Sequence, residues 1–387
     1  MKKKIAIIGS TGSIGKTLLK IINKDKKNFD ILLLTARKNY KVLLNQAKIF
    51  KVRNLIITDK KYFQIANSKN LNKKICIYNS FNELDKIIKK KLDYVMSSII
   101  GLDGLVPTIK IIKHTKKIAI ANKESIICGW NLIQKELNQS KTKFLPVDSE
   151  HFSIWKTLNH YKHPNIDKIY ITASGGPFLK TPLNEIKNVK ISQALKHPNW
   201  KMGKKISIDS ATMMNKVFEV IEAKNIFNVS YNKIDILVHP NSYIHAIIKF
   251  NDGISKIIAH DTSMEIPIFN TLYDQENKTI KSKDLNIKKL NNLNLQKINK
   301  NTFPSIKTLK LIPKKNSLFE TILVTSNDEF VELFLKNKIK FHQISKYLLN
   351  FIKLKEFNKF KKLSPKNVTD IMKLSKYVRL KIKSLSI

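Results

Sequence analysis

Residues 4–147 alternate between short apolar runs and stretches with helical spacing. Apolar runs of this length, bounded by turn residues, are typical of buried strands. The predicted strands are Lys4–Ile8, Ile31–Ala36, Leu55–Ile57, Ile75–Ile77, Tyr94–Met96, Lys117–Ala121 and Phe144–Val147. The alternation of strands with helices predicts an α/β fold that begins with a Rossmann-like doubly wound sheet over residues 1–148.

The pattern changes after Val147 and predicts a central α+β domain over residues 149–273. There we expect strands at Ile169–Ala173 and Ile206–Asp209, a helix over Ser210–Glu219, and strands of antiparallel type at Asp235–His239, Ser242–Phe250 and Ile254–Ala259. Residues 274–301 are rich in Lys and Asn and are predicted to be a linker. Residues 302–387 have mostly helical spacing, which predicts a C-terminal helical domain.

The net charge of +43 is large enough to suggest a nucleic-acid-binding protein. The lysines are spread along the whole chain, however, and only Arg37, Arg53 and Arg379 carry the guanidinium fork that base readout favours. We therefore expect no specific nucleic-acid partner. The sequence has no apolar run of about 18 residues, so it predicts no membrane span. Its two cysteines indicate a reducing compartment, and the cytoplasm is the expected location.

A glycine-rich turn, Gly9–Gly15, lies directly between the first predicted strand and a helical pattern. In this context the glycines let backbone N–H groups approach a pyrophosphate at the helix N-terminus, although a plain strand-to-helix turn remains the alternative. After the second strand, Arg37, Lys38 and Asn39 stand where an NAD enzyme usually places an acid. Because cations there attract a 2′-phosphate, the predicted cofactor is NADP.

Two carboxylates, Asp148 and Glu150, follow the strand Phe144–Val147 with one serine between them. Side chains two apart at the end of a strand point the same way, so both can converge on one point. Oxygen ligands suit Mg²⁺ or Mn²⁺. The alternative is that Asp148 or Ser149 only caps the following helix.

The predicted helix Ser210–Glu219 combines polar groups that suit an anion and a cation. Asn215 and Glu219, spaced i and i+4, share a helical face, and Lys216 lies beside them. Ser210 near the helix N-terminus, with Asn215 and Lys216, makes a plausible phosphate cradle, and Glu219 could supply a third carboxylate to the cation. An ordinary amphipathic helix is the alternative.

Other segments carry weaker signals. Asn122–Ser125 is expected at the carboxyl edge of the parallel sheet, where ligands of such folds bind. Ser174–Pro177 offers a hydroxyl and backbone amides to an oxyanion. Lys196–Gly203 has no periodicity and is either a flap that closes over substrate or a lid on a small core. His239 and His245 lie among the antiparallel strands, where a histidine is more often structural than a ligand.

Together these segments closely resemble the 1-deoxy-D-xylulose 5-phosphate reductoisomerase family. The motifs that carry the resemblance are GSTGSIG at Gly9–Gly15, ANKES at Ala121–Ser125, LPVDSEH at Leu145–His151, SGGPF at Ser174–Phe178, HPNWKMG at His197–Gly203 and ISIDSATMMNK at Ile206–Lys216. The resemblance implies a homodimeric oxidoreductase that uses NADPH with Mg²⁺ or Mn²⁺. The implied reaction is isomerisation and reduction of 1-deoxy-D-xylulose 5-phosphate to 2-C-methyl-D-erythritol 4-phosphate, a step of non-mevalonate isoprenoid biosynthesis.

Residue by residue, the resemblance implies a metal site, a substrate site and a cofactor site. The implied metal ligands are Asp148, Glu150 and Glu219, and the implied catalytic residues are these three with Lys123 and His197. The implied substrate-binding residues are Lys123, Ser149, Glu150, Ser174, His197, Trp200, Met202, Ser210, Asn215, Lys216, Glu219 and His245. The cofactor-binding residues are Thr11, Gly12, Ser13, Ile14, Arg37, Lys38, Asn39, Asn122, Glu124 and Gly203.

The chain departs from the family pattern at some positions. Arg37 stands where the family usually has Gly, Val217 and Phe218 replace Gly-Leu, and Thr262–Glu265 replaces Pro-Asp-Met-Arg. Because the metal and phosphate residues are kept, we expect effects on efficiency and stability rather than on reaction type. The alternatives are another NADP-dependent dehydrogenase of a phosphorylated substrate and a basic nucleic-acid-binding protein.

Overall fold

The computed structural model describes residues 2–70, 74–159, 161, 164–200 and 202–385, so Lys201 of the predicted flap lies outside the described residues. Two compact units make up the chain. The first comprises Met1–Ser125, Asn131–Asp148 and Met264–Ile280, and the second comprises Ile126–Trp130, Ser149–Ser263 and Lys281–Ile387.

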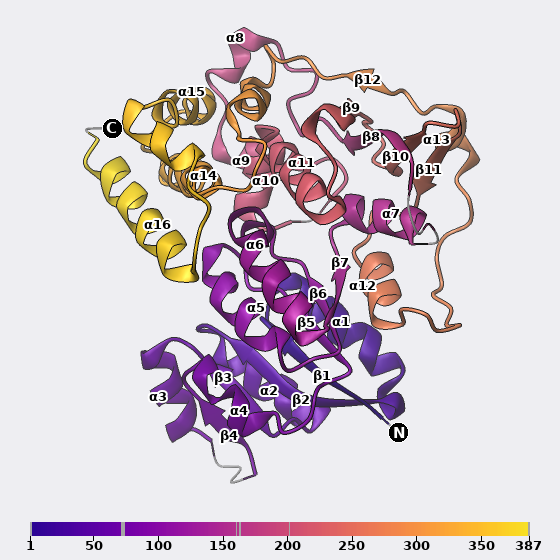
Figure 1. The fold of residues 1–387 in the computed structure, drawn as a ribbon, viewed down its shortest axis with the longest axis vertical. Helices are drawn as coiled ribbons and strands as arrows, with labels where there is room; N and C mark the ends of the chain where they lie inside the picture. The colour runs from indigo at the N-terminus through magenta and orange to yellow at the C-terminus, as the bar shows by residue number, and fades with distance from the viewer. Residues whose placement is uncertain (1, 71–73, 160, 162–163, 201, 386–387) are drawn as a thin grey trace. The chain divides into compact units, whose positions relative to one another are not determined.

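The first unit is built on a parallel sheet with seven strands among the described residues, in the order β4-β3-β2-β1-β5-β6-β7 (Figure 1). Their bounds are β1 (Lys3–Ile8), β2 (Phe29–Ala36), β3 (Asn54–Ile57), β4 (Cys76–Tyr78), β5 (Tyr94–Ser97), β6 (Lys117–Ile120) and β7 (Lys143–Pro146). The order reverses between β2 and β5, on either side of β1. The carboxyl end of β1 is therefore the switch point at which such sheets bind ligands. The predicted doubly wound sheet is confirmed.

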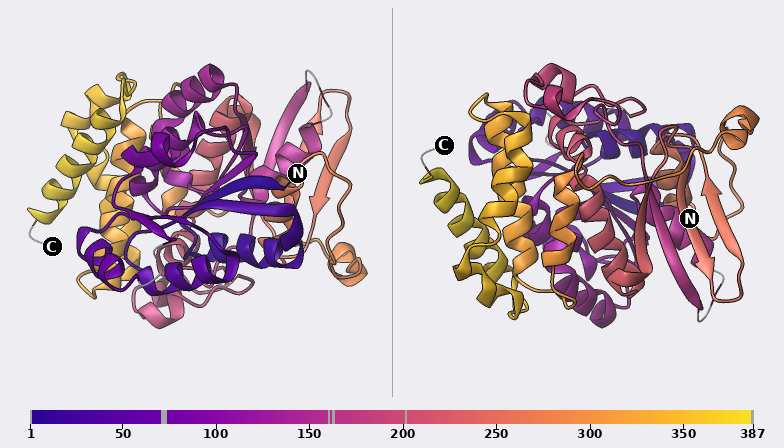
Figure 2. Two further views of the ribbon diagram at one scale, coloured as in Figure 1. Left: turned by 90° about the horizontal axis from the view of Figure 1, so that it is seen from below. Right: turned by 90° about the horizontal axis from the view of Figure 1, so that it is seen from above.

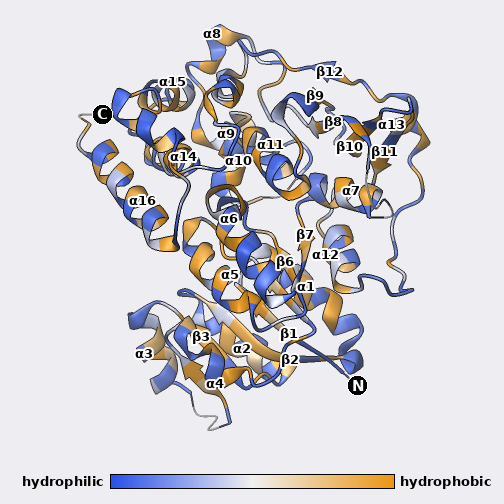
Figure 3. Cartoon of the chain, in the orientation of Figure 1, coloured by the Kyte–Doolittle hydropathy of each residue, from blue (hydrophilic) through white to orange (hydrophobic). Residues whose placement is uncertain are grey.

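Helices connect these strands and keep their apolar sides on the sheet. They are α1 (Ser13–Lys24), α2 (Tyr40–Phe50), α3 (Lys60–Ser68), α4 (Leu84–Ile87), α5 (Leu105–Ile112) and α6 (Lys123–Ser140), with the 3-10 turns η1 (Lys26–Asn28), η2 (Phe81–Glu83) and η3 (Leu102–Gly104). A later helix of this unit, α12 (Glu265–Leu272), packs against α1. Figure 3 shows the strands as mainly hydrophobic and the helices as two-sided. Ile5, Ile7, Leu33 and Leu55 are fully buried, which explains why unbroken apolar runs predicted these strands.

The second unit contains a mixed sheet, with five described strands in the order β11-β10-β8-β9-β12. Their bounds are β8 (Ile166–Ala173), β9 (Ile234–Val238), β10 (Ile244–Phe250), β11 (Ser255–Ala259) and β12 (Gln296–Lys297). The antiparallel prediction is confirmed for β10 and β11. It is only partly right for β9, which is antiparallel to β12 but parallel to β8. The long helical connection between β8 and β9 makes this parallel pairing possible.

The helices of the second unit include the segments that carry most of the predicted site. They are α7 (Ser149–Leu158), α8 (Leu183–Ile186), α9 (Ile191–Ala194), α10 (Lys204–Ala211), α11 (Met214–Phe227), α13 (Ile287–Asn291), α14 (Phe319–Leu335), α15 (Phe341–Phe351) and α16 (Val368–Lys383), with η4 (Tyr231–Lys233), η5 (Pro304–Leu311) and η6 (Lys355–Lys361). The predicted helical character of the C-terminal stretch is confirmed, because α14, α15 and α16 lie within it. Helix α14 packs on both α15 and α16 (yellow to orange in Figures 1 and 2).

Two local predictions were wrong. Ile206–Asp209 is part of helix α10 rather than a strand, and Ser210 lies in the last turn of α10 rather than at the start of the next helix. Met213, with a left-handed φ of 63°, separates α10 from α11 and redirects the chain. Glu150 lies in the first turn of α7. Strand alternation therefore does not set the direction of its side chain.

Candidate functional site

Two carboxylates from different helices of the second unit face the same ammonium group. Nζ of Lys216 donates to Oε1 of Glu150 at 2.8 Å and also to Oε2 of Glu219. The carboxylates of Glu150 and Glu219 lie within 4.8 Å of each other. Burial alone would lower the pKa of Lys216, but the two acids raise it above its ordinary value, so the ammonium stays charged.

Contacts between α7 and α11 hold these acids in place. Asn215 Nδ2 donates to Oε1 of Glu219, which confirms the predicted i, i+4 relationship. The buried ring of His151 contacts the backbone carbonyl of Glu219 through Nε2 at 2.9 Å. Ser149 Oγ donates to Oε2 of Glu150. Sequence reasoning did not select His151 as a site residue, although it ends the LPVDSEH motif.

Asp148, the last residue of the first-unit segment Asn131–Asp148, is paired with another lysine. Lys123 begins α6 just after β6, Asp148 follows β7, and the two strands are parallel neighbours. Their carboxyl ends meet at one edge, where Lys123 forms an ion pair with Asp148. Asp148 is two residues before Glu150, so covalent geometry keeps their Cα atoms within about 7 Å.

The predicted flap (Lys196–Gly203) contacts the turn Ser174–Pro177, called the oxyanion turn below, through His197 and Ser174. Nδ1 of His197 accepts hydrogen bonds from the backbone N–H groups of Asn199 at 3.1 Å and Trp200 at 3.0 Å. Nδ1 therefore carries no proton, and Nε2–H donates to Ser174 Oγ at 3.0 Å. Burial, together with the charge of Lys216, lowers the pKa of His197 to about 4, so the ring is neutral near pH 7.

The oxyanion turn also packs against the end of α10. Gly176 has a φ of 65°, and a Cβ there would lie 3.0 Å from the carbonyl oxygen of Ser210. Gly176 N–H donates to Ser174 Oγ at 3.1 Å. Ser174 and Ser210, both predicted to bind the substrate's phosphate, are therefore brought close together. This holds although Ser210 lies at the end of α10 and not, as predicted, at the start of the next helix. Met202, half-buried, precedes Gly203, the N-cap of α10.

His245 is buried against another histidine. Its ring stacks on that of His260 with centroids 3.7 Å apart, and its Nε2 lies 3.2 Å from the His260 carbonyl oxygen. Trp200 contacts it edge-on at 6.2 Å. Burial, aided by His260, lowers the pKa of His245 to about 3. No motif in the sequence pointed to His260, because its partners come from other segments.

The glycine-rich turn of the first unit places backbone amides at the N-terminus of α1. Gly12 is the N-cap, and Ser13 and Ile14 begin the helix. Gly9 has a φ of 90°, and a Cβ on Gly15 would lie 2.5 Å from the Cα of Ser10. The turn and the close helix–strand approach therefore require glycine at these two positions.

The other predicted cofactor residues of the first unit lie at helix starts or in turns. Asn39 is the N-cap of α2, and exposed Arg37 forms an ion pair of 2.7 Å with Asp103. Asn122 caps α6, accepting from Ser125 N–H at 2.5 Å and donating to Gly101 O at 2.8 Å. Asn122 thus fixes the backbone of the neighbouring loop. The remaining residues of this set are Thr11, which is half-buried, Lys38, which is exposed, and Glu124, which is buried.

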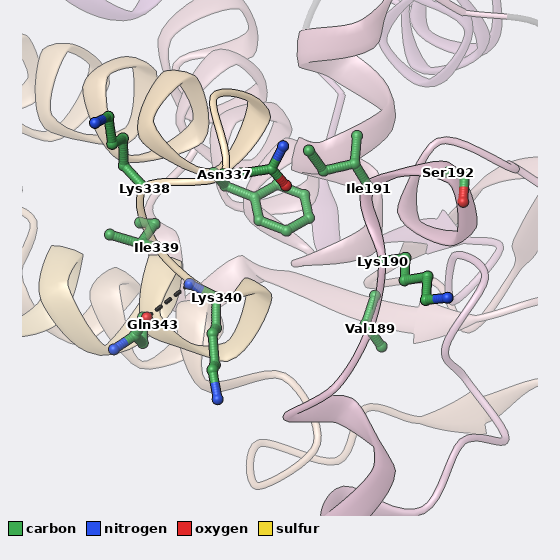
Figure 4. Close-up of a pocket in the computed structure, with 10 residues that line it drawn as sticks. Val189, Lys190, Ile191, Ser192, Asn337, Lys338, Ile339, Lys340 and Gln343 are labelled. Carbon is green, nitrogen blue, oxygen red and sulfur yellow. Dashed lines mark hydrogen bonds between the residues drawn. The ribbon is translucent and has the colours of Figure 1, made fainter.

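A separate pocket of about 670 Å³ lies in the second unit, between the start of α9 and the turn from α14 to α15 (Figure 4). Its wall includes Lys190, Ile191 and Lys340, and the Lys340 N–H donates to Gln343 Oε1 at 2.6 Å. None of the predicted site residues lines it. Among the described residues, we find no helix with both the length and the apolar character needed to cross a bilayer.

The sheet with its glycine-rich turn, the acids of α7 and α11, and the polar flap define a dinucleotide-dependent oxidoreductase. Residues 5–129 match the family model described as 1-deoxy-D-xylulose 5-phosphate reductoisomerase. Residues 144–227 match the model of the C-terminal domain of that enzyme, and residues 261–381 match a second model described as the DXP reductoisomerase C-terminal domain.

Whole-chain comparisons agree. The 1-deoxy-D-xylulose 5-phosphate reductoisomerase of Pelagibacter ubique (strain HTCC1062) is 58% identical over 387 residues, which covers 100% of each chain. The solved structure of the Zymomonas mobilis enzyme in complex with NADPH has a TM-score of 0.88 at 29% identity and covers 100% of both chains. A structure of DOX-P reductoisomerase in complex with NADPH, fosmidomycin and magnesium has a TM-score of 0.89 at 29% identity, with coverage of 99% of this chain and 98% of that one. The chain belongs to the 1-deoxy-D-xylulose 5-phosphate reductoisomerase family.

Proposed function

We propose that this chain catalyses the NADPH- and divalent-metal-dependent isomerisation and reduction of 1-deoxy-D-xylulose 5-phosphate to 2-C-methyl-D-erythritol 4-phosphate, a step of non-mevalonate isoprenoid biosynthesis. Its family membership supports this reaction. So do the solved relatives that hold NADPH and magnesium. The observation in the structure that carries the proposal is the convergence of Glu150 and Glu219 on Lys216.

The proposed metal ligands are Asp148, Glu150 and Glu219. Carboxylate oxygens are the ligands that Mg²⁺ and Mn²⁺ prefer. Two carboxylates already turned toward one cationic group fit such an ion, and Asp148 is tethered two residues from one of them. When bound, the divalent cation supplies Lewis-acid polarisation of the substrate's carbonyl, and NADPH supplies the hydride.

The two lysines that pair with these acids have a second task in this proposal. In the structure Lys123 neutralises Asp148, and Lys216 neutralises the Glu150/Glu219 pair. If these carboxylates held a divalent cation, both ammonium groups would be available to the substrate. Lys123, with Ser149, then contacts the hydroxy-ketone end of the substrate. Lys216 is freed to bind its phosphate.

The phosphate site is proposed to be completed by Ser174, Ser210 and Asn215. Its support is the direct packing of the oxyanion turn on the end of α10. His197 is neutral, and its Nε2–H donates to Ser174 Oγ. It therefore donates a hydrogen bond and does not serve as a base at neutral pH. Trp200 and Met202, in the flap, cover the bound substrate and exclude water from the reacting carbons, and His245 lies near the phosphate end.

NADPH is proposed to bind at the carboxyl edge of the parallel sheet. Its pyrophosphate lies on the amides of Thr11, Gly12, Ser13 and Ile14 at the N-terminus of α1, where the helix dipole favours negative charge. The 2′-phosphate is held by Arg37, Lys38 and Asn39, and Asn122, Glu124 and Gly203 complete the site.

Further parts of the proposal concern organisation. Residues 1–148 form the NADPH-binding domain, 149–273 the catalytic domain, 274–301 a linker and 302–387 a C-terminal helical domain. The enzyme works as a homodimer in the cytoplasm, with Mn²⁺ able to replace Mg²⁺ and with no specific nucleic-acid partner. The dispersed lysines and the scarcity of arginine support the last point.

The test is turnover by the purified protein with NADPH, Mg²⁺ or Mn²⁺, and 1-deoxy-D-xylulose 5-phosphate. We expect metal-dependent loss of NADPH absorbance with formation of the branched polyol phosphate. Fosmidomycin, which a solved relative binds together with NADPH and magnesium, should inhibit in competition with the substrate. A folded sample that binds NADPH but does not oxidise it under these conditions would contradict the proposed reaction.

A further inference from the structure

The side chain of Asn199, in the middle of the flap, is fully engaged as a donor. Its Nδ2 group donates to the carbonyl oxygen of Pro240 at 2.7 Å and to Oγ of Ser242 at 2.8 Å. A carboxamide has two N–H donors, and both have acceptors here. The carbonyl of Pro240 can only accept, so the orientation of the amide is determined.

The two acceptors belong to a turn that is itself fixed to the sheet. Ser242 has a left-handed φ of 48°, and its N–H donates to the carbonyl of His239 at 3.0 Å. The N–H of His239 donates to Ala173 O at 2.7 Å, at the end of β8. Since Ala173 directly precedes Ser174, Asn199 fastens the flap to the same strand end that presents the oxyanion turn.

The backbone of Asn199 acts on His197 at the same time. Its N–H and that of Trp200 donate to Nδ1 of His197, which leaves Nε2–H as the donor to Ser174 Oγ. Oγ of Ser174 also accepts from the Gly176 N–H. With both acceptor positions of this hydroxyl used, its own proton is free to be donated to an oxyanion.

We propose that Asn199 is a positioning residue that fastens the flap to Pro240 and Ser242, and so orients His197 as the donor to Ser174 Oγ and Ser174 as a donor to the substrate's phosphate. This inference rests on the proposed function of the phosphate site. Asn199 is only half-buried, and it lies in a segment without regular secondary structure. Its side chain therefore acts on the flap and contributes little to the core.

The test is a graded series of variants in the full-length enzyme. Asn199→Ala removes both bonds, Asn199→Asp replaces a donor by a carboxylate that repels Pro240 O, and Ser242→Ala removes one bond only. We expect KM for 1-deoxy-D-xylulose 5-phosphate to rise about tenfold or more in both Asn199 variants and about threefold in Ser242→Ala. The inhibition constant of inorganic phosphate should rise in parallel. KM for NADPH and the thermal midpoint should stay near wild-type values.

Asn184→Ala, at an exposed position on α8, is the matched control and should change none of these quantities. Unchanged phosphate inhibition and substrate KM in Asn199→Ala would overturn the inference. So would an equal loss of NADPH affinity together with a lower thermal midpoint, because that is the result of a purely structural role. Absence of turnover in the wild-type enzyme would instead contradict the proposed function, and phosphate binding measured alone would then still test Asn199.

Discussion

Nζ of Lys216 lies 2.8 Å from Oε1 of Glu150, although the two residues belong to different helices and are 66 positions apart in sequence. The same ammonium reaches Glu219 one turn further along α11. This lysine was predicted as a phosphate ligand, yet here it neutralises two acids predicted to bind metal. The two assignments are compatible if metal and phosphate are bound together, because the carboxylates and the ammonium then each have a partner of opposite charge.

The first prediction concerns the stability of the metal-free protein. Lys216→Met removes the cation faced by two acids, one of which, Glu219, is only 1% exposed. Breaking a buried ion pair by removing one partner costs about 3–5 kcal/mol, so urea unfolding in the presence of EDTA should show a loss of that size. Saturating Mg²⁺ should recover most of it. Lys204→Met, at an exposed position on α10, is the control, and an equal loss in both variants would contradict the pairing.

The second prediction concerns acid. The pKa of His245 is lowered to about 3 by burial and by His260, against about 6.5 in the unfolded chain. Between these values the unfolded state binds a proton that the folded state does not, so stability falls as pH decreases through this window. When the pH is lowered from about 7.5 to about 5, the free energy of unfolding of His245→Asn should therefore fall by about 2 kcal/mol less than that of the wild type.

The measurement is the free energy of unfolding by urea at the two pH values, and the difference between the two values is compared among the proteins. His342→Gln, which changes a half-buried histidine on α15, should alter the difference much less. Identical acid sensitivity of wild type and His245→Asn would refute the assigned cause.

The third prediction compares alanine substitutions at two glycines of the glycine-rich turn Gly9–Gly15. A Cβ on Gly15 would lie 2.5 Å from backbone of Ser10, whereas one on Gly12 meets nothing closer than 3.4 Å. Overpacking of this kind costs about 1–3 kcal/mol, so Gly15→Ala should lower the thermal midpoint of the protein and Gly12→Ala should lower it far less. Equal midpoints for the two variants would show that the helix does not approach the strand this closely.

Much of the first unit could be predicted from sequence because its strands are buried on both faces. Ile5 and Ile7 are fully covered, so the apolar runs were unbroken and easy to locate. The glycine-rich turn could also be predicted, because local backbone geometry requires glycine at Gly9 and Gly15. Such features depend on neighbours in sequence.

The second unit was harder because distant contacts override local pattern. Ile206 and Ile208 alternate with polar residues and suggested a strand, yet this segment is helical. Asp209 is buried there and accepts from Asn327 Nδ2 at 2.7 Å. The alternation could not reveal a partner on α14. The stacking of His260 on His245 was missed for the same reason.

Convergence of the acids was predicted for a partly incorrect reason. Strand alternation was expected to align Asp148 with Glu150, but Glu150 lies in the first turn of helix α7. Its direction follows from packing of α7 on α11, where His151 contacts the Glu219 backbone. The motif alone thus indicated which acids to consider, whereas the contact between Glu150, Glu219 and Lys216 became visible only in the fold.

The most direct test of the account is the metal dependence of NADPH oxidation in Glu150→Gln and Glu219→Gln, with Glu185→Gln on α8 as the exposed control. Loss of even an outer partner of a metal ligand costs about 10–100-fold, so each site variant should lose more than about 100-fold in Mg²⁺-dependent turnover. NADPH affinity, measured by fluorescence without substrate, should stay within about twofold of wild type because no carboxylate of this pair contacts the nucleotide in the proposed site. Turnover that survives in either variant, or NADPH affinity that falls as far as turnover does, would contradict a metal site built on these two acids.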